Sequence, residues 1–247
     1  MRRPSTSSSP TIPTTATATA PTASATATAI LRGVVLAAAA AAAAAAAVTG
    51  AAATTFAAGA FPWTGTVTLT SSSGGTLSWT LRSEAGGVLV AEGRSPAWTV
   101  VHRARPDGTP VSTTTTKGAH TASVTYRPDG ASFTWKKGAE GGTHEVAAAG
   151  LWDGDALEVR LAGIDWTKSK SITFKVLDTD SEDGDVYEMK ATFEGEESCA
   201  KGPCRHVKVA LAGIKAAFGP KWHFWFGSGP GAPFLKFEGR IGTFEAK

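Results

Sequence analysis

Residues 171–194 read SITFKVLDTDSEDGDVYEMKATFE, and this stretch decides the class of fold. Apolar side chains stand at every second position on both sides of an acidic centre, and threonine, lysine and glutamate fill the positions between them. A period of two is typical of a strand that has one buried and one wet face. Two such runs joined by a polar turn predict an antiparallel hairpin.

The acidic centre of this hairpin, residues 178–185, has two interpretations. Its five carboxylates resemble a calcium loop, in which oxygen atoms surround a hard cation. An EF-hand loop that begins at Asp178 would need glycine where Asp183 stands, and flanking helices are not predicted. We predict an exposed, solvated hairpin turn, with calcium binding as the alternative.

The same alternation recurs through the chain from residue 64 onward. It is clearest at 67–69, 76–82, 132–136, 206–211 and 222–226. Sequences rich in Gly, Pro and Asp at 72–75, 86–87, 105–108, 127–130 and 141–142 predict turns between the strands. The spacing of these signals predicts a mainly β fold with about nine to ten antiparallel strands.

One segment breaks the pattern. Residues 153–164 read DGDALEVRLAGI, with Leu157, Leu161 and Ile164 at helical spacing and Asp153 or Asp155 placed to cap the first turn. We predict one short helix here. A strand is the alternative, because Leu157, Val159 and Leu161 also fit a period of two.

The predicted strands each present an apolar face, and one short helix is the only predicted element that could cover them. The sheet should therefore curl around its own apolar side into a strongly curved half-barrel, with the helix over the concave face. Such a concavity suits an apolar ligand, although bulky residues can also fill a small barrel completely. The predicted lining residues are Trp79, Trp98, Trp135, Leu157, Leu161, Phe174, Trp222, Phe224 and Phe226.

The first 60 residues indicate export. Residues 4–29 are almost all Ser, Thr, Pro and Ala, a composition typical of disorder. Arg32, the apolar run 33–48 and Ala-x-Ala sites at 51–53 and 58–60 have the arrangement of a secretory signal. We predict a leader with a signal peptide over 1–60 and a single periplasmic or secreted domain over 61–247. A retained membrane anchor is the alternative.

The charge balance argues against a nucleic-acid partner. The 247 residues include 24 Lys and Arg and 21 Asp and Glu. Arg2, Arg3 and Arg32 lie in the first 60 residues, which hold no acidic residue, so the predicted domain contains 21 charges of each sign. Nucleic-acid binding requires basic residues clustered on one surface.

The two cysteines, Cys199 and Cys204, flank Ala-Lys-Gly-Pro between two strand-like runs. A turn there brings their backbones within reach of a disulfide, which an oxidising compartment permits. A metal-binding pair is the alternative, but tetrahedral zinc needs about four ligands and His206 alone does not complete the set. We predict the disulfide and no metal site.

Common catalytic signatures are missing from the sequence. It has neither a Gly-x-Ser-x-Gly elbow nor a phosphate-binding loop nor a dinucleotide-binding turn. His144-Glu145 begins like a zincin motif, but Ala148 stands where the second zinc-binding histidine is required. We therefore predict that the protein is not an enzyme and has no cofactor.

The aromatic run at 222–226 suggests a second kind of function. Trp222, Phe224 and Phe226 should face one side of the sheet, and His223 and Trp225 the other. A Trp on the wetter face could stack on a sugar or a lipid headgroup, or lie under a covering loop.

From residue 64 to 240, the order of elements resembles a known family. A short helical segment near Leu157 precedes strand-like runs at 171–178, 184–191, 204–209, 222–226 and 233–239. This order is similar to bacterial periplasmic proteins of unknown function with a lipoprotein-carrier-like (LolA-like) half-barrel. The resemblance implies a concave face that holds acyl chains or another apolar molecule, and no catalytic residues. The chain departs from lipid-anchored members because no cysteine follows the apolar run.

Two functions therefore remain as expectations. The first is a non-catalytic envelope protein that binds a lipid or other apolar ligand in the concave face. The alternative is a structural or interaction module that contacts envelope polysaccharide or protein through exposed aromatics such as Trp225. The candidate partners are thus a lipid or apolar small molecule and a peripheral contact with the membrane or envelope.

Overall fold

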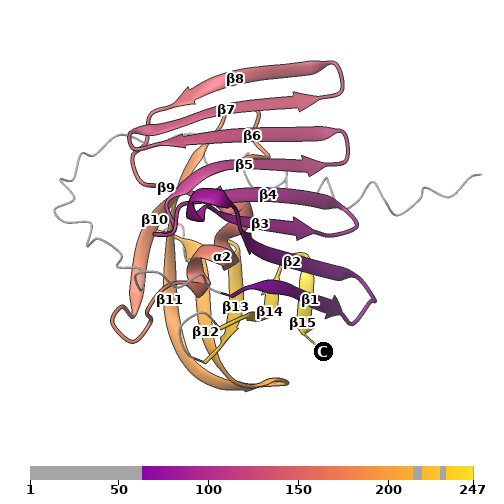
Figure 1. Cartoon of the computed structure of the whole chain (residues 1–247), viewed down its shortest axis with the longest axis vertical. Helices are drawn as coiled ribbons and strands as arrows, with labels where there is room; N and C mark the ends of the chain where they lie inside the picture. Colours follow the sequence, from indigo (N-terminus) through magenta and orange to yellow (C-terminus); the bar gives the residue numbers. More distant parts are fainter. Residues whose placement is uncertain (1–62, 214–218, 229–231, 247) are drawn as a thin grey trace, which may run out of the picture. The chain divides into compact units, whose positions relative to one another are not determined.

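The computed structural model describes residues 63–213, 219–228 and 232–246. The predicted leader and signal peptide, residues 1–60, lie outside the described residues. The described part of the chain forms one 15-stranded sheet, one α-helix and two 3-10 helices, η1 (Ala85–Gly87) and η2 (Gly154–Ala156) (Figure 1). None of its helices is both long and apolar enough to cross a bilayer.

The first half of the domain is a meander of antiparallel strands. Each strand pairs with the next along the chain. The strands are β1 (Gly65–Ser71), β2 (Thr76–Ser83), β3 (Leu89–Arg94), β4 (Trp98–Ala104), β5 (Pro110–Lys117), β6 (His120–Arg127), β7 (Gly130–Lys137) and β8 (Glu140–Val146).

The second half returns along the sheet from its other edge. A short strand pairs in parallel with the strand after the helix, and all later pairs are antiparallel. The elements are β9 (Leu151–Asp153), α2 (Leu157–Ala162), β10 (Ser171–Leu177), β11 (Val186–Cys199), β12 (Gly202–Leu211), β13 (Lys221–Gly227), β14 (Phe234–Gly239) and β15 (Gly242–Ala246).

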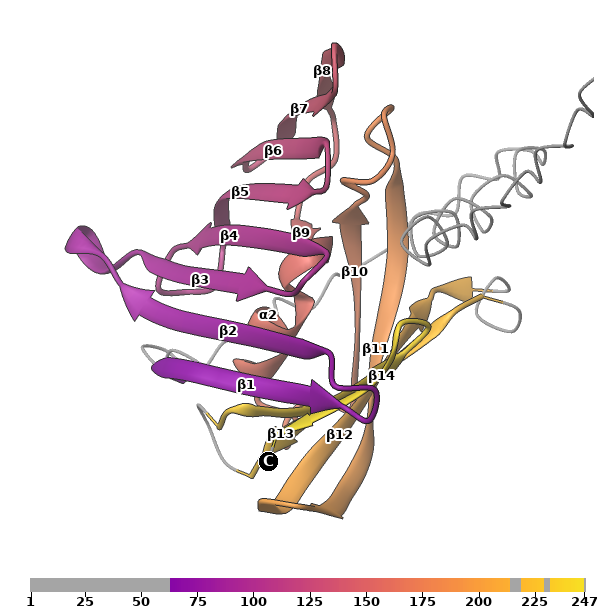
Figure 2. The same cartoon turned by 90° about the vertical axis from the view of Figure 1, so that its right-hand side faces the viewer.

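The two halves join where β15 pairs with β1, so the first and last strands are neighbours in mid-sheet. β8 and β9, which follow one another in the chain, form the two edges. Figure 2 shows the halves facing each other with α2 between them. Their inner faces share a core, in which Val124 of β6 and Phe133 of β7 pack with Leu177 of β10. The prediction of a curled, antiparallel, mainly β sheet with one short helix is confirmed.

The predicted number of strands is wrong, because several strands lack an apolar alternation. In β5 the inward, buried positions are Thr113 and Thr115, so its sequence shows no apolar face. β9 has only three residues. The expected turn at 141–142 lies inside β8, and the turn falls earlier, at Gly138, which has a φ of 63°. The turns predicted at 105–108 and 127–130 are confirmed, joining β4 to β5 and β6 to β7.

The predicted helix is confirmed, and its strand alternative is wrong. The Asp153 carboxylate accepts a hydrogen bond of 2.9 Å from the backbone N–H of Asp155, which caps η2 directly before α2. Leu157, Val159 and Leu161 are all buried in α2. A helix packed between two layers buries residues around most of its circumference, so apolar residues can also fall at every second position. This is why the sequence of α2 also fitted a strand.

Two tryptophans pack over a glycine on β3. The rings of Trp79 and Trp98 have their centroids 6.1 Å apart. A Cβ atom placed on Gly93 would stand 2.7 Å from the Trp79 ring and 2.8 Å from the Trp98 ring. Because Trp79 is 1% exposed in the centre of the core, its ring cannot move away without disturbing its neighbours. Gly93 is thus required for the close approach of the rings.

We expect Gly93→Ala to lower the free energy of unfolding by about 1–3 kcal/mol, the usual cost of overpacking a core. Urea unfolding followed by tryptophan fluorescence measures the change. Thr99→Ser on the exposed face of β4 is the control and should change stability far less. An unchanged midpoint for Gly93→Ala would show that the two rings have room to move.

Candidate functional site

The interior of the curled sheet brings together most of the predicted lining residues. Eight of the nine belong to one core cluster or pack against it, and Trp135 packs against the second cluster, near β7. Phe226 and Leu161 are fully buried, whereas Trp98 and Trp222 are half-buried. The predicted residues thus form an inner wall on which both halves of the sheet and α2 meet.

Two tryptophans of this wall were missed by sequence reasoning. Trp152 of β9 stacks on Phe174 of β10 with ring centroids 4.1 Å apart. Trp166, after α2, is 1% exposed and donates its indole N–H to the Leu161 carbonyl at 3.1 Å. A three-residue strand and an irregular connection show no periodicity, so only the aromatic residue type indicated burial.

Helix α2 introduces two ionisable side chains into this apolar interior. Burial raises the pKa of Glu158 to about 8; the nearby Trp79 indole offsets this in part, and Asp153 and Asp155 add to it. Burial likewise lowers the pKa of Arg160 to about 10. The Arg160 guanidinium lies 4.0 Å from the centre of the Trp152 ring, a cation–π contact. At neutral pH, the Glu158 carboxyl is therefore mainly protonated and uncharged.

A network of polar side chains lies where β4 and β5 face β9, η2 and the β10–β11 turn. Its centre is Asp153, 3% exposed, whose Oδ2 lies 2.7 Å from His102 Nδ1 and accepts a hydrogen bond from the Thr113 hydroxyl. We call the whole network the polar clasp. It consists of His102, Thr113, Thr115, Lys117, Asp153, Asp155, Thr179 and Asp180.

The other end of the polar clasp is an ion-pair network centred on Lys117. Its ammonium lies 3.1 Å from Asp155 Oδ1 and 2.7 Å from Asp180 Oδ1. The Asp155 carboxylate also accepts hydrogen bonds from Thr115 at 2.7 Å and Thr179 at 2.5 Å. Burial opposes both charges, but the pKa of Lys117 is raised by the two carboxylates and that of Asp155 is lowered by Lys117 and the hydroxyls. Both groups are charged near neutral pH.

The hydroxyl, imidazole and carboxylate of the polar clasp do not form a nucleophile relay. In a Ser-His-Asp relay, the imidazole uses one nitrogen for the hydroxyl and the other for the carboxylate. Here Nδ1 of His102 contacts both the Thr113 hydroxyl, at 3.0 Å, and Asp153. The Thr113 hydroxyl donates directly to Asp153. The arrangement therefore ties these strands together and differs from the geometry of that relay.

The acidic segment 178–185 is a hairpin turn, as predicted, but it is not purely solvated. The Asp178 N–H donates to the Asp185 carbonyl at 2.8 Å. Asp180 joins the polar clasp, and Glu182 accepts a hydrogen bond from Lys137 of β7 at 3.0 Å. The turn is thereby tied to the first half of the sheet. Calcium binding at this turn remains only an alternative.

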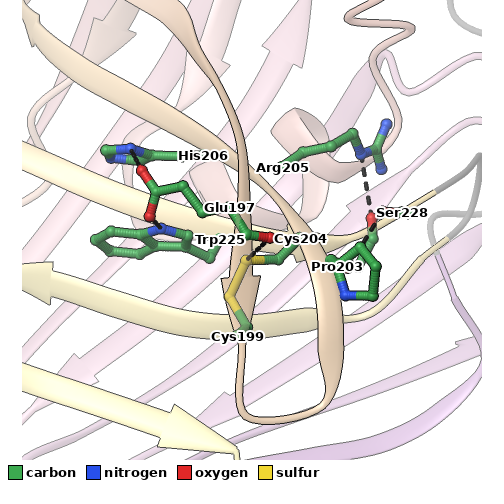
Figure 3. Close-up of a disulfide and its surroundings, with 9 residues drawn as sticks. Glu197, Cys199, Pro203, Cys204, Arg205, His206, Trp225 and Ser228 are labelled. Atoms are coloured by element: carbon green, nitrogen blue, oxygen red, sulfur yellow. Dashed lines mark hydrogen bonds and ion pairs between the residues drawn. A yellow bond between two sulfur atoms is a disulfide. The ribbon is translucent and has the colours of Figure 1, made fainter.

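The outer face of β11 to β14 carries a second group of interacting polar and aromatic side chains, around the disulfide (Figure 3). The predicted disulfide between Cys199 and Cys204 is confirmed, with Cα atoms 5.9 Å apart. Trp225 belongs to the cluster around Cys204, separate from the main core, so it faces away from Phe224 as predicted.

Trp225 is nevertheless only 5% exposed. His206 stacks on its ring with centroids 4.4 Å apart, and the Lys236 ammonium lies 4.3 Å from the ring centre. These two residues are its neighbours on β12 and β14, so side chains cover the ring from both sides.

Comparison with known proteins gives a likeness of fold. No protein-family model and no curated protein matches the chain. A solved structure, the β-barrel-like protein of the domain of unknown function DUF1849 from Brucella abortus, matches with a TM-score of 0.52 and 10% sequence identity. The match covers 74% of this chain and 93% of that protein. The two chains therefore share a barrel-like β fold.

Replacing Lys117 tests the polar clasp. Lys117→Met would leave Asp155 and Asp180 without their cation, and we expect the free energy of unfolding to fall by about 2–4 kcal/mol. Lys137→Met is the matched control, since its ion pair with Glu182 is more exposed and should contribute at most about 1 kcal/mol. Urea unfolding at pH 7 compares them. Equal losses would contradict the role assigned to Lys117.

The raised pKa of Glu158 predicts that the stability of the fold depends on pH. Its pKa is about 8 in the folded chain and near its ordinary value of 4.5 when unfolded. Between these values the folded state holds a proton that the unfolded state has lost, so this contribution to stability falls as pH rises. We expect Glu158→Gln to gain stability relative to the parent from pH 5 to pH 9.

Unfolding midpoints at pH 5, 7 and 9 measure this difference. The control is Glu188→Gln on the exposed side of β11. A difference between parent and Glu158→Gln that stays constant over this range would disprove the raised pKa.

Proposed function

We propose that the protein is a non-catalytic protein of the cell envelope, periplasmic or secreted, that binds a lipid or other apolar ligand between the two halves of its curled sheet. The observation that carries this proposal is the open side of the sheet. Among the described strands, β8 and β9 are unpaired edges, and side-chain contacts such as the polar clasp hold that side together. These side-chain contacts can open, and the two halves of the sheet can separate there, without breaking backbone hydrogen bonds between strands.

The interior suits an acyl chain because its wall is aromatic and aliphatic. Burial contributes about 0.8 kcal/mol for each CH2 group, so a chain of ordinary length gains enough to offset partial separation of the halves. Glu158 and Trp79 supply the few polar groups that would orient a ligand headgroup. The LolA-like half-barrel resemblance supports the same function, and the disulfide fits an oxidising compartment.

Contact with polysaccharide through Trp225 is the less favoured function. A sugar platform needs an open aromatic face, and His206 and Lys236 already cover this ring.

Lipid mass spectrometry of the purified chain, followed by titration of the delipidated protein with cis-parinaric acid, tests the proposal. We expect a co-purified lipid and saturable fluorescence that palmitate displaces. Lys117→Met should take up and release the probe faster than the parent, whereas Lys137→Met should resemble the parent. A chain that carries no lipid and also fails to bind the probe would refute lipid binding.

A further inference from the structure

Two histidines on the outer face of the sheet point ring nitrogens at each other. Nε2 of His206, on β12, lies 2.8 Å from Nδ1 of His223, on β13. The pair is separate from the polar clasp and from the proposed ligand site, because His206 and Trp225 face away from the main core. His206 keeps 12% of its side chain exposed, and His223 is half-buried. Solvent therefore reaches the pair.

The other nitrogen of His206 is fixed by a carboxylate. Nδ1 of His206 lies 2.7 Å from Glu197 Oε1, and the second oxygen of Glu197 accepts the Trp225 indole N–H at 2.9 Å. An ionised carboxylate can only accept, so Nδ1 of His206 carries a proton. In the neutral imidazole, Nε2 of His206 is then an acceptor, and it accepts a hydrogen bond from Nδ1–H of His223. Metal-binding histidines typically have this same carboxylate partner on their second nitrogen.

The Glu197 carboxylate is itself held in place. Glu197 lies opposite Cys204 in the β11–β12 ladder, and the disulfide joins Cys204 to Cys199 two residues further along β11. Figure 3 shows Glu197 between His206 and Trp225, next to this disulfide. The Trp225 ring stacks on His206 at an interplanar angle of 8°. His206 is therefore oriented on its ring face and at Nδ1, and a metal ion at Nε2 would replace the hydrogen bond from His223, whose proton would move to the other nitrogen of that ring.

The spacing of the two nitrogens is close to that of a chelating pair. Two imidazole nitrogens bound to one tetrahedral zinc ion at about 2.0–2.1 Å stand about 3.3–3.4 Å apart. The observed 2.8 Å would have to widen by about half an ångström, which a small rotation of the half-buried His223 ring provides.

Carboxylates and ammonium groups both surround the pair. Glu238 is the partner of His223 on β14, and Glu194 forms an ion pair with Lys208, the partner of His223 on β12. Glu197 is the carboxylate that contacts the pair directly, at His206.

We propose that His206 and His223 are the protein ligands of a binding site for a divalent transition metal ion that prefers imidazole, such as Zn²⁺ or Cu²⁺. Among the residues that the structure describes, no group of three or more His, Cys, Asp and Glu side chains is placed to hold a metal. The site thus has two protein ligands, and water completes the coordination. The strand pattern placed His223 on the outer face with Trp225, and His206 was weighed as a metal ligand only beside the cysteines, so the sequence did not connect the two histidines.

Calorimetric titration of the full chain, purified without a histidine tag and with its disulfide intact, tests the proposal. We expect one-to-one binding of Cu²⁺ and Zn²⁺, tighter for Cu²⁺, and no binding of Mg²⁺, which prefers oxygen ligands. His223→Gln should weaken binding at least about tenfold. Glu197→Gln should weaken it roughly 10–100-fold, as the loss of such an orienting carboxylate does.

His144→Gln is the matched control, because His144 is a half-buried histidine on β8, in the other half of the sheet. Near-UV circular dichroism verifies that each variant is folded, and His223→Asn replaces His223→Gln if that variant is not. Electron paramagnetic resonance of the Cu²⁺ form should show two coupled nitrogens in the parent and one without His223. No saturable binding by the parent, or equal weakening by His144→Gln and His223→Gln, would overturn the site.

Discussion

The pairing of β1 with β15 is the constraint on which the rest of the sheet depends. Leu69, fully buried in β1, lies opposite Ala246 in the last strand, so the two ends of the described domain meet in the middle of the sheet. Each half then runs outward from this seam, and the two edges come from strands that are consecutive in the chain. Because the halves share one apolar interior, the edges are brought to the same side of the curl, where backbone pairing gives way to side-chain contacts.

Those side-chain contacts show how a sheet can close without a complete ladder. Burying Asp153, Asp155 and Lys117 costs desolvation energy, which hydroxyl groups and opposite charges offset at this one place. A ladder between β8 and β9 would leave little freedom to separate. The polar clasp instead specifies which strands face each other, because each of its carboxylates needs particular partners on β4 or β5.

Much of the fold could be predicted from the periodicity of the sequence, but the contacts that form the candidate sites could not. The sequence predicted β2 because Leu77, Trp79 and Leu81 alternate with polar residues. It predicted α2 because Leu157 and Leu161 stand at helical spacing. β5 gave no such signal, since Thr113 and Thr115 use inward positions for hydrogen bonds. Residues 40 positions apart meet in the polar clasp, and 17 positions separate His206 from His223. Which of these residues come into contact depends on the order of the strands in the sheet. The local sequence pattern does not encode that order.

The inner and outer faces of the second half use aromatic residues differently. Phe224 and Phe226 join the main core, where their rings contact one another and Phe234. Trp225 lies between them in sequence and supports polar side chains on the opposite face. Alternation along a single strand thus separates an apolar wall from a set of oriented nitrogen and oxygen atoms.

The late position of β15 in the chain also has a consequence for biosynthesis. During synthesis, β15 emerges after the other described strands, so β1 and β14 until then each have backbone groups unpaired on one side. Contacts of such large sequence separation form slowly, and exposed strand edges invite association with other chains. Until β15 has been synthesised, one side of β1 and one side of β14 are therefore open edges at which other chains can pair.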